Sequence, residues 1–146
     1  MKKKGFTLVE LLAVIAILAI LVIIALPNVM GMFRNAKKNS FLTEVKEIYK
    51  TAQQQWMMDS MMNTNAMLYG RVNNALGTGC SKMLDMSGRT ELDYIVKIDK
   101  SGNVTQLLAT DGTYSYTSPA GNLKIEAISL TNVTDLTGTK PALKCN

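Results

Sequence analysis

The sequence predicts an α+β fold, in which a long N-terminal α-helix packs on a four-stranded antiparallel β-sheet. First, the apolar stretch from Phe6 to Leu26 would form a helix of about 31 Å, close to the thickness of a bilayer core. Second, apolar residues then recur at spacings of three to five as far as Trp56, which is typical of an amphipathic helix. Third, from Tyr94 onward short β-rich runs alternate with turn sequences, which predicts strands.

The apolar stretch contains a single ionisable residue, Glu10, and follows the basic run Lys2–Lys4. A carboxylate at mid-membrane costs about 2.5–3.5 kcal/mol on insertion scales, so such a group is by default a functional-site hypothesis. A secretory signal peptide is one alternative, but the run exceeds the usual ~7–15 residues and no A-x-A-like site closes it. A simple anchor held by the positive-inside rule would explain the lysines but not Glu10.

Residues 4–10, Lys-Gly-Phe-Thr-Leu-Val-Glu, resemble the class III leader junction of type IV prepilins, and the similarity extends to Pro27. This resemblance implies that a membrane-embedded peptidase cuts after Gly5 and methylates the new amino terminus on Phe6. It also implies that Thr7 and Glu10 are the threonine and glutamate that the family carries near that terminus. It does not separate pilins from the pseudopilins of type II secretion or from competence pilins.

Physical reasoning assigns Glu10 a role in subunit assembly. Cleavage after Gly5 would leave a cationic amine on Phe6, one helical turn before the Glu10 carboxylate. The amine of an incoming subunit could neutralise Glu10 of a docked subunit, and breaking a buried pair of this kind typically costs about 3–5 kcal/mol. We therefore expect Phe6, Thr7 and Glu10 to mark the assembly site, with Glu10 selecting the register of polymerisation.

The chain is expected to divide into a leader, an apolar helix and one small head. The helix and head together would have the lollipop shape that the resemblance to pilins implies. Pro27 removes a backbone hydrogen bond and Gly31 weakens the next turn, so a kink or local melting is expected there. The predicted ranges are 1–5 for the leader peptide, 6–27 for the transmembrane or filament-core helix, and 28–146 for the head. Within the head they are 28–60 for the amphipathic helix, 61–93 for a variable loop, 94–130 for the sheet and 131–146 for the C-terminal tail.

The predicted helix face and strands can be given residue by residue. The core-facing stripe comprises Val29, Phe33, Ala36, Phe41, Val45, Ile48, Ala52 and Trp56. The four strands are expected at 94–99, 104–110, 113–118 and 123–130, as an antiparallel meander. Asp111-Gly112 between two β-rich runs is the strongest hairpin signal.

The segment between helix and sheet is harder to interpret. Residues 69–76 could form a short helix or a loop, ended by Gly77-Thr78-Gly79. Five methionines follow Trp56, and they could fill the core at the end of the helix or offer thioether ligands to Cu(I). Core filling is the preferred interpretation, because polar residues at 63–65 interrupt a regular ligand spacing. These methionines are Met57, Met58, Met61, Met62 and Met67.

Cys80 and Cys145 are the only cysteines. In an exported chain two thiols most often pair, so we expect a structural disulfide that ties the tail across the sheet. The chain-entropy model gives about 4 kcal/mol for a loop of this size. Two free buried thiols are the alternative, and a redox-active pair is disfavoured because C-x-x-C spacing is absent.

Nothing in the composition favours catalysis. The chain has no histidine, which excludes histidine-based triads and metal sites, and it has no phosphate-binding fingerprint. Asp135 alone is too little to support a calcium site in the C-terminal loops. The formal net charge is +5, and the run Lys2–Lys4 contributes three of these charges, so a nucleic-acid surface is not favoured. We expect no catalytic residues, no metal site and no cofactor.

The expected function is that of a structural subunit of a type IV pilus serving adhesion, motility or DNA uptake. The alternatives are a pseudopilin of a type II secretion or competence system and a monomeric membrane-anchored binding module. The expected partners are further copies of the chain in a helical homopolymer, the prepilin peptidase and methylase, the assembly machinery, minor pilins, the membrane before assembly, and a host or abiotic surface. The chain would be a single-pass inner-membrane protein before assembly and part of an extracellular filament afterwards.

Overall fold

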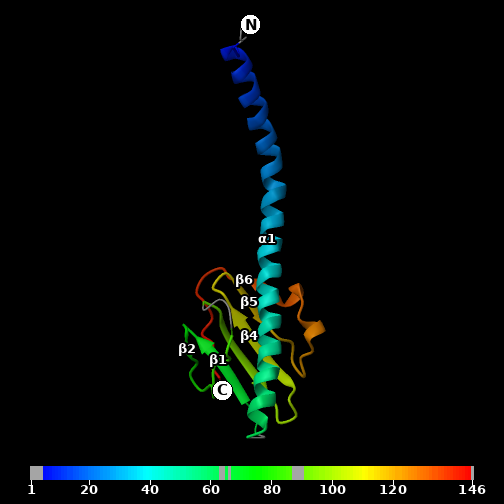
Figure 1. The fold of residues 1–146 in the computed structure, drawn as a ribbon, viewed down its shortest axis with the longest axis vertical. Helices are drawn as coiled ribbons and strands as arrows, with labels where there is room; N and C mark the ends of the chain where they lie inside the picture. The colour runs from blue at the N-terminus through cyan, green and yellow to red at the C-terminus, as the bar shows by residue number, and fades with distance from the viewer. Residues whose placement is uncertain (1–4, 63–64, 66, 87–90, 146) are drawn as a thin grey trace. The chain divides into compact units, whose positions relative to one another are not determined.

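The computed structural model describes residues 5–62, 65, 67–86 and 91–145. The elements in chain order are α1 (Leu8–Ser60), β1 (Met67–Val72), β2 (Ala75–Leu76), β3 (Asp93–Ile98), β4 (Val104–Thr110), β5 (Tyr114–Thr117), two 3₁₀ turns, η1 (Ile125–Ala127) and η2 (Leu130–Asn132), and β6 (Val133–Asp135) (Figure 1). The chain forms two compact units, Met1–Lys37 and Lys38–Asn146. We call the second unit the head.

The first unit consists mainly of the apolar part of α1. This part is long and apolar enough to span a membrane, with a mean hydropathy of 3.2 in its most apolar window. The helix continues without a break past Pro27 and Gly31, so the local melting considered for this region is absent, whereas the kink stays a prediction. Val29 and Phe33 are exposed, which shows that the predicted core stripe was extended too far toward the N-terminus.

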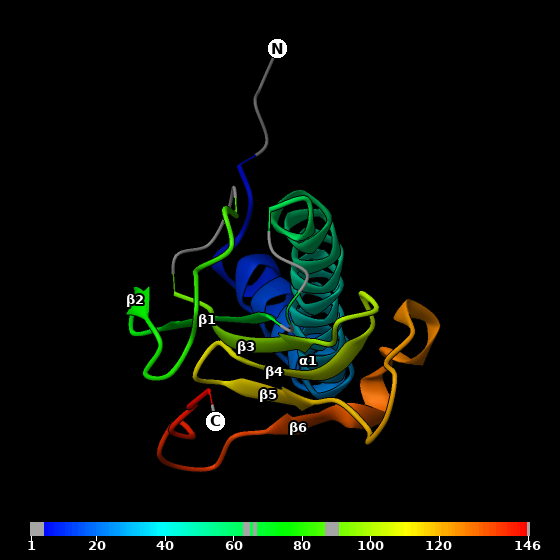
Figure 2. The ribbon, with the colours of Figure 1, turned by 90° about the horizontal axis from the view of Figure 1, so that it is seen from below.

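The head contains a six-stranded antiparallel sheet in the order β2-β1-β3-β4-β5-β6. The part of α1 that belongs to the head lies over one face of this sheet (Figure 2). The α+β prediction is therefore confirmed, but the sheet has six strands in the described part of the chain rather than four.

The core of the head lies between α1 and this face of the sheet. Its helical side chains recur at helix spacing, and burying each large one stabilises the fold by about 1.5–3 kcal/mol. The helix contributes Phe41, Leu42, Val45, Ile48, Tyr49 and Ala52. The buried residues from the strands include Tyr69, Tyr94, Val96, Ile98, Val104, Leu107 and Tyr116.

The first two strands replace the short helix or loop considered for residues 69–76. They form a hairpin in which Arg71 pairs with Leu76 and Val72 pairs with Ala75. The two turn residues, Asn73 and Asn74, have φ of 51° and 60°. Asparagine tolerates this left-handed conformation better than most residues, and a two-residue hairpin turn of this kind requires it at both positions.

The strand predicted at 123–130 is wrong, because this segment contains η1 and the first residue of η2 instead. Leu123 and Ile128 are its two well-buried apolar residues, and their spacing of five does not fit the period of a strand. The sheet edge is completed by β6, in which Val133 pairs with Tyr116 of β5. The hairpin predicted around Asp111-Gly112 is confirmed by the antiparallel pairing of β4 with β5.

The methionines after Trp56 do not fill the core as predicted, with the exception of Met67, which packs against its edge. Four of them are exposed, by 58% to 95% of their surface: Met57, Met58, Met61 and Met62. The end of the helix is packed by Trp56 instead, whose ring lies against Gly102 in the turn before β4.

Candidate functional site

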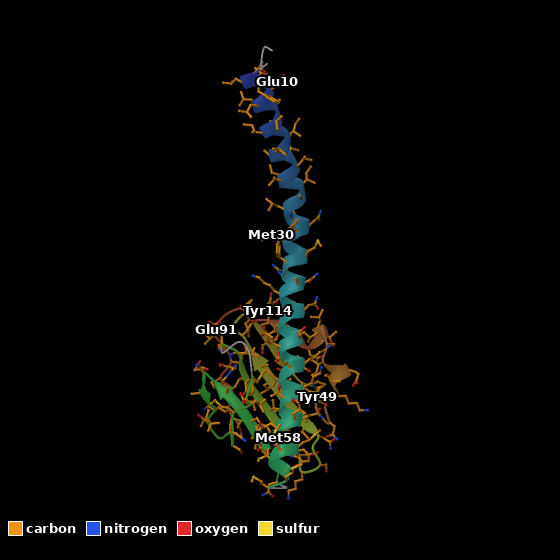
Figure 3. The ribbon with its side chains drawn as sticks, in the orientation of Figure 1. Glu10, Met30, Tyr49, Met58, Glu91 and Tyr114 are labelled. Atoms are coloured by element: carbon orange, nitrogen blue, oxygen red, sulfur yellow. A yellow bond between two sulfur atoms is a disulfide. The ribbon has the colours of Figure 1, made fainter. Side chains whose placement is uncertain are left out.

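Glu10 lies in the first turn of α1 (Figure 3), and the other predicted cleavage and assembly residues directly precede the helix in the chain. Thr7 precedes the first helical residue, and its carbonyl oxygen accepts a hydrogen bond from the Leu11 amide at 3.3 Å. The Thr7 amide and hydroxyl both donate to Oε2 of Glu10 at 2.9 Å. In return, the Glu10 amide donates to Oγ1 of Thr7 at 3.3 Å. This reciprocal arrangement is a capping box, with Thr7 as the N-cap and Glu10 at the third helical position.

The capping box holds Glu10 close to the predicted new terminus. Oε2 of Glu10 is occupied by Thr7, whereas Oε1 accepts no hydrogen bond from the residues that the structure describes. Phe6 directly precedes the cap, and 84% of its surface is exposed. The structure thus brings Thr7 and Glu10 together, directly after Phe6, and leaves one carboxylate oxygen of Glu10 for a further donor.

Reasoning from the sequence missed the capping box. Thr7 entered the prediction only through the family resemblance. The pattern Thr-x-x-Glu directly before an apolar run is itself a recognised helix-start signal, and here it spans residues 7–10. It would have predicted both the start of the helix and the position of the carboxylate.

The predicted disulfide between Cys80 and Cys145 is present in the structure, with the two Cα atoms 5.0 Å apart. It joins the C-terminal tail to the segment after β2, and the Cys145 amide also donates to the Thr78 carbonyl at 3.1 Å. Ile95, Leu143 and Cys145 form a second small core. The tail is therefore fixed against the head, as the sequence predicts.

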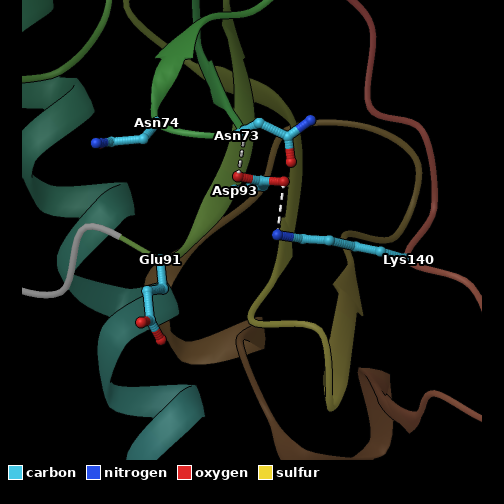
Figure 4. A pocket seen from close by; sticks show the side chains of 5 residues that line it. All are labelled: Asn73, Asn74, Glu91, Asp93 and Lys140. Atoms are coloured by element: carbon cyan, nitrogen blue, oxygen red, sulfur yellow. Dashed lines mark hydrogen bonds and ion pairs between the residues drawn. The ribbon is translucent and has the colours of Figure 1, made fainter.

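A polar hollow of about 300 Å³ lies beside this tail, between the β1–β2 turn and β3 (Figure 4). Asp93 is buried there, and its carboxylate lies 2.8 Å from the Lys140 ammonium group and accepts a hydrogen bond from the Asn73 amide. Figure 4 shows the Glu91 carboxylate pointing away from this pair. Because Asp93 is paired and hydrogen-bonded, we interpret the pair as a structural anchor for the tail.

A second polar cluster fixes the C-terminal end of α1. The Asp59 carboxylate accepts hydrogen bonds from Gln55 at 3.1 Å, Tyr69 at 2.9 Å and Lys82 at 3.0 Å. Burial alone would raise the pKa of Asp59, but these donors, with Lys82 foremost, outweigh it and hold that pKa below its ordinary value. Burial and the neighbouring Asp59 carboxylate raise the pKa of Tyr69. This cluster ties the helix end to β1 and to the segment that follows β2.

The comparison with protein families bears on the first of these sites. Residues 1–26 match the family model described as the prokaryotic N-terminal methylation motif, which is the class III signal peptide of type IV pilins. No curated protein and no solved structure matches the chain.

This motif supports a type IV pilin or a pseudopilin-like protein, and together with the fold it suggests a structural, non-enzymatic role. It implies processing by prepilin peptidase and assembly into a filament. The motif and the apolar helix also fit a membrane-anchored precursor that ends up in a surface filament.

Proposed function

We propose that this chain is a structural subunit of a type IV pilus, which polymerises through its N-terminal helix into a surface filament. The observation that carries this proposal is the leader junction at Gly5-Phe6, directly followed by the capping box of Thr7 and Glu10. The filament would serve adhesion, motility or DNA uptake. The chain itself would have no enzymatic activity.

Cleavage after Gly5 creates the group that Glu10 needs. The new amine on Phe6 remains a cation after methylation, and it stands directly before the helix cap. The amine of one subunit can approach Oε1 of Glu10 on a neighbouring subunit, because Oε2 is already bound to Thr7. Among packed apolar helices a wrong stagger leaves both charges unpaired, at a cost of about 3–5 kcal/mol. The pair therefore favours one register.

The apolar side chains of α1 supply the attraction between subunits. From Leu8 to Leu26 every residue of the helix is exposed within this chain. In a membrane these side chains contact lipid, and in a filament in water they need to be buried against other copies of the same helix. A contact of this kind, repeated by a rotation that does not close, produces an open helical polymer.

The test separates the charge of Glu10 from its capping role. Glutamine can replace glutamate in a capping box, so Glu10→Gln keeps the cap but removes the charge. Thr7→Ser is the matched control, because serine keeps both the cap and the charge. Each variant is expressed in the cells that produce the chain, and the chain is quantified in the membrane fraction and in filaments sheared from the surface.

We expect Glu10→Gln to be processed and to accumulate in the membrane but to be absent from filaments, whereas Thr7→Ser assembles normally. Normal filaments from Glu10→Gln would overturn the role of the charge. Long sheared fibres composed mainly of this chain support the pilus. A chain that is processed but never found in surface fibres would instead indicate a pseudopilin, and an unprocessed chain would indicate a monomeric anchored module.

A further inference from the structure

The C-terminal end of α1 presents a cluster of thioethers to solvent. Met57 and Met58 are exposed by 58% and 63%, and Met61 and Met62 by 89% and 95%. Figure 3 shows Met58 near the lower end of the helix, on the head. These side chains do not contribute to the core, so the core packing expected from the sequence does not explain why they are there.

The spacing of these residues allows their sulfur atoms to converge. Met57 and Met58, in the last turn of α1, precede Met61 by four and three residues, a spacing that on a helix places side chains about 5–6 Å apart at Cβ, and Met61 is the first residue after α1. Metal–sulfur bonds are about 2.3 Å long, so sulfurs that share one small cation lie about 4 Å apart. Flexible methionine side chains can cover this difference by changing rotamers.

The backbone beneath the cluster is held in place. Asp59, between the two methionine pairs, accepts hydrogen bonds from Tyr69 and Lys82, which belong to other segments of the head. The Ser60 hydroxyl donates to the Met57 carbonyl at 2.9 Å, and the Met62 amide donates to the Asp59 carbonyl at 3.1 Å. These bonds keep Met61 and Met62 close to the last turn of the helix.

The chemistry of the cluster selects the ligand. Thioethers are soft, uncharged ligands, and soft sulfur ligands favour Cu(I) over hard cations such as Mg²⁺ or Ca²⁺. The chain has no histidine, and both cysteines are consumed by the disulfide. The Asp59 carboxylate, the nearest hard ligand in sequence, is already occupied by three donors. Outside the cytoplasm a thioether site also has an advantage over a thiol site, because it cannot be lost to disulfide formation.

We propose that Met57, Met58 and Met61 form a surface site for a soft monovalent cation, Cu(I), with Met62 within reach as a fourth ligand. The site depends only on the folded head and not on filament assembly. Binding would leave the fold unchanged and would order side chains that otherwise extend into solvent.

The test uses Ag(I), a redox-stable monovalent ion with the same preference for sulfur. The full chain, labelled with ¹³C at the methionine methyl groups, is titrated in detergent micelles with silver nitrate in chloride-free buffer. We expect a saturable change in the methyl signals of Met57, Met58 and Met61, complete at one Ag(I) per chain. Single methionine-to-leucine variants assign these signals.

Two double variants decide whether the cluster is the site. Met58→Leu/Met61→Leu is expected to weaken Ag(I) binding about tenfold or more, since even the groups that support metal ligands contribute 10–100-fold to affinity. Met32→Leu/Met83→Leu removes the same number of exposed thioethers from separate parts of the chain and should leave the affinity unchanged. Leucine preserves the volume, and an unchanged melting temperature verifies the fold. The absence of saturation, or an equal loss in both double variants, would overturn the proposal.

Discussion

The bridge between Cys80 and Cys145 provides a quantitative test of how the C-terminal tail stabilises the head. The perturbation is the double variant Cys80→Ser/Cys145→Ser, studied as the full chain in detergent. The two residues are 65 positions apart, and the chain-entropy model gives about 4 kcal/mol for a loop of this size. For a unit of roughly 110 residues this corresponds to a fall in melting temperature of about 15 °C.

The structure also indicates what the double variant should retain. The Lys140–Asp93 ion pair, at 2.8 Å, and the buried side chain of Leu143 still hold the tail. The variant should therefore unfold in a single cooperative transition with native-like near-ultraviolet circular dichroism below it. The wild-type chain with its disulfide reduced is the matched control, because it removes the bridge without changing the side chains.

Thermal unfolding followed by circular dichroism, with Trp56 as the near-ultraviolet probe, measures the effect. The variant and the reduced wild type should both melt about 15 °C below the oxidised chain. A shift of less than about 3 °C in both would refute the reasoning, since it would show that the bridge hardly restricts the unfolded chain.

Three further predictions follow from other contacts. Gly70→Ala should destabilise the head by about 1–3 kcal/mol, because any side chain at this position would collide with Cys80 Sγ. Gly31→Ala is the control, because Gly31 lies in α1, outside the head, and an added methyl group meets no neighbouring atom there. Urea unfolding of the head in both variants measures the difference. Because the pKa of Asp59 is lowered in the folded state, the Asp59 carboxylate should stabilise the head above its ordinary pKa, and this stabilisation should be lost as the pH falls through the folded pKa. The difference in unfolding free energy between wild type and Asp59→Asn should therefore shrink below about pH 4. A difference that grows on acidification would contradict this. Thr7→Ala should destabilise the first turn of α1 by about 1 kcal/mol and should therefore speed hydrogen exchange of its amides relative to Thr7→Ser. Equal exchange rates in the two variants would argue against the capping box.

Periodicity in the sequence was sufficient to predict the central elements of the head. The stripe from Phe41 to Ala52 is buried at helix spacing, and the runs that contain β3, β4 and β5 were located correctly. These segments follow the rule that a helix or strand buries one face. The same reasoning failed for 123–130, where alternating apolar residues occur in a segment that crosses the edge of the core in 3₁₀ turns.

The other errors have local physical causes. The β1–β2 hairpin was missed because its signal is the two-residue turn Asn73-Asn74 and not a long β-rich run. The exposed methionines were wrongly predicted to lie in the core. Their apolar composition does not show which face of the last helical turn packs against the sheet. At the N-terminus, the role of Glu10 was inferred from its charge in an apolar stretch. Its hydrogen bonds with Thr7 could have been predicted from the Thr-x-x-Glu pattern, which places the two residues three positions apart.

The most direct test of the proposed function is the intact mass of this chain in filaments sheared from the cell surface. The account predicts a chain that begins at Phe6, carries one added methyl group and contains the Cys80–Cys145 disulfide. Filaments without this chain, or with a chain that still carries the residues up to Gly5, would contradict it.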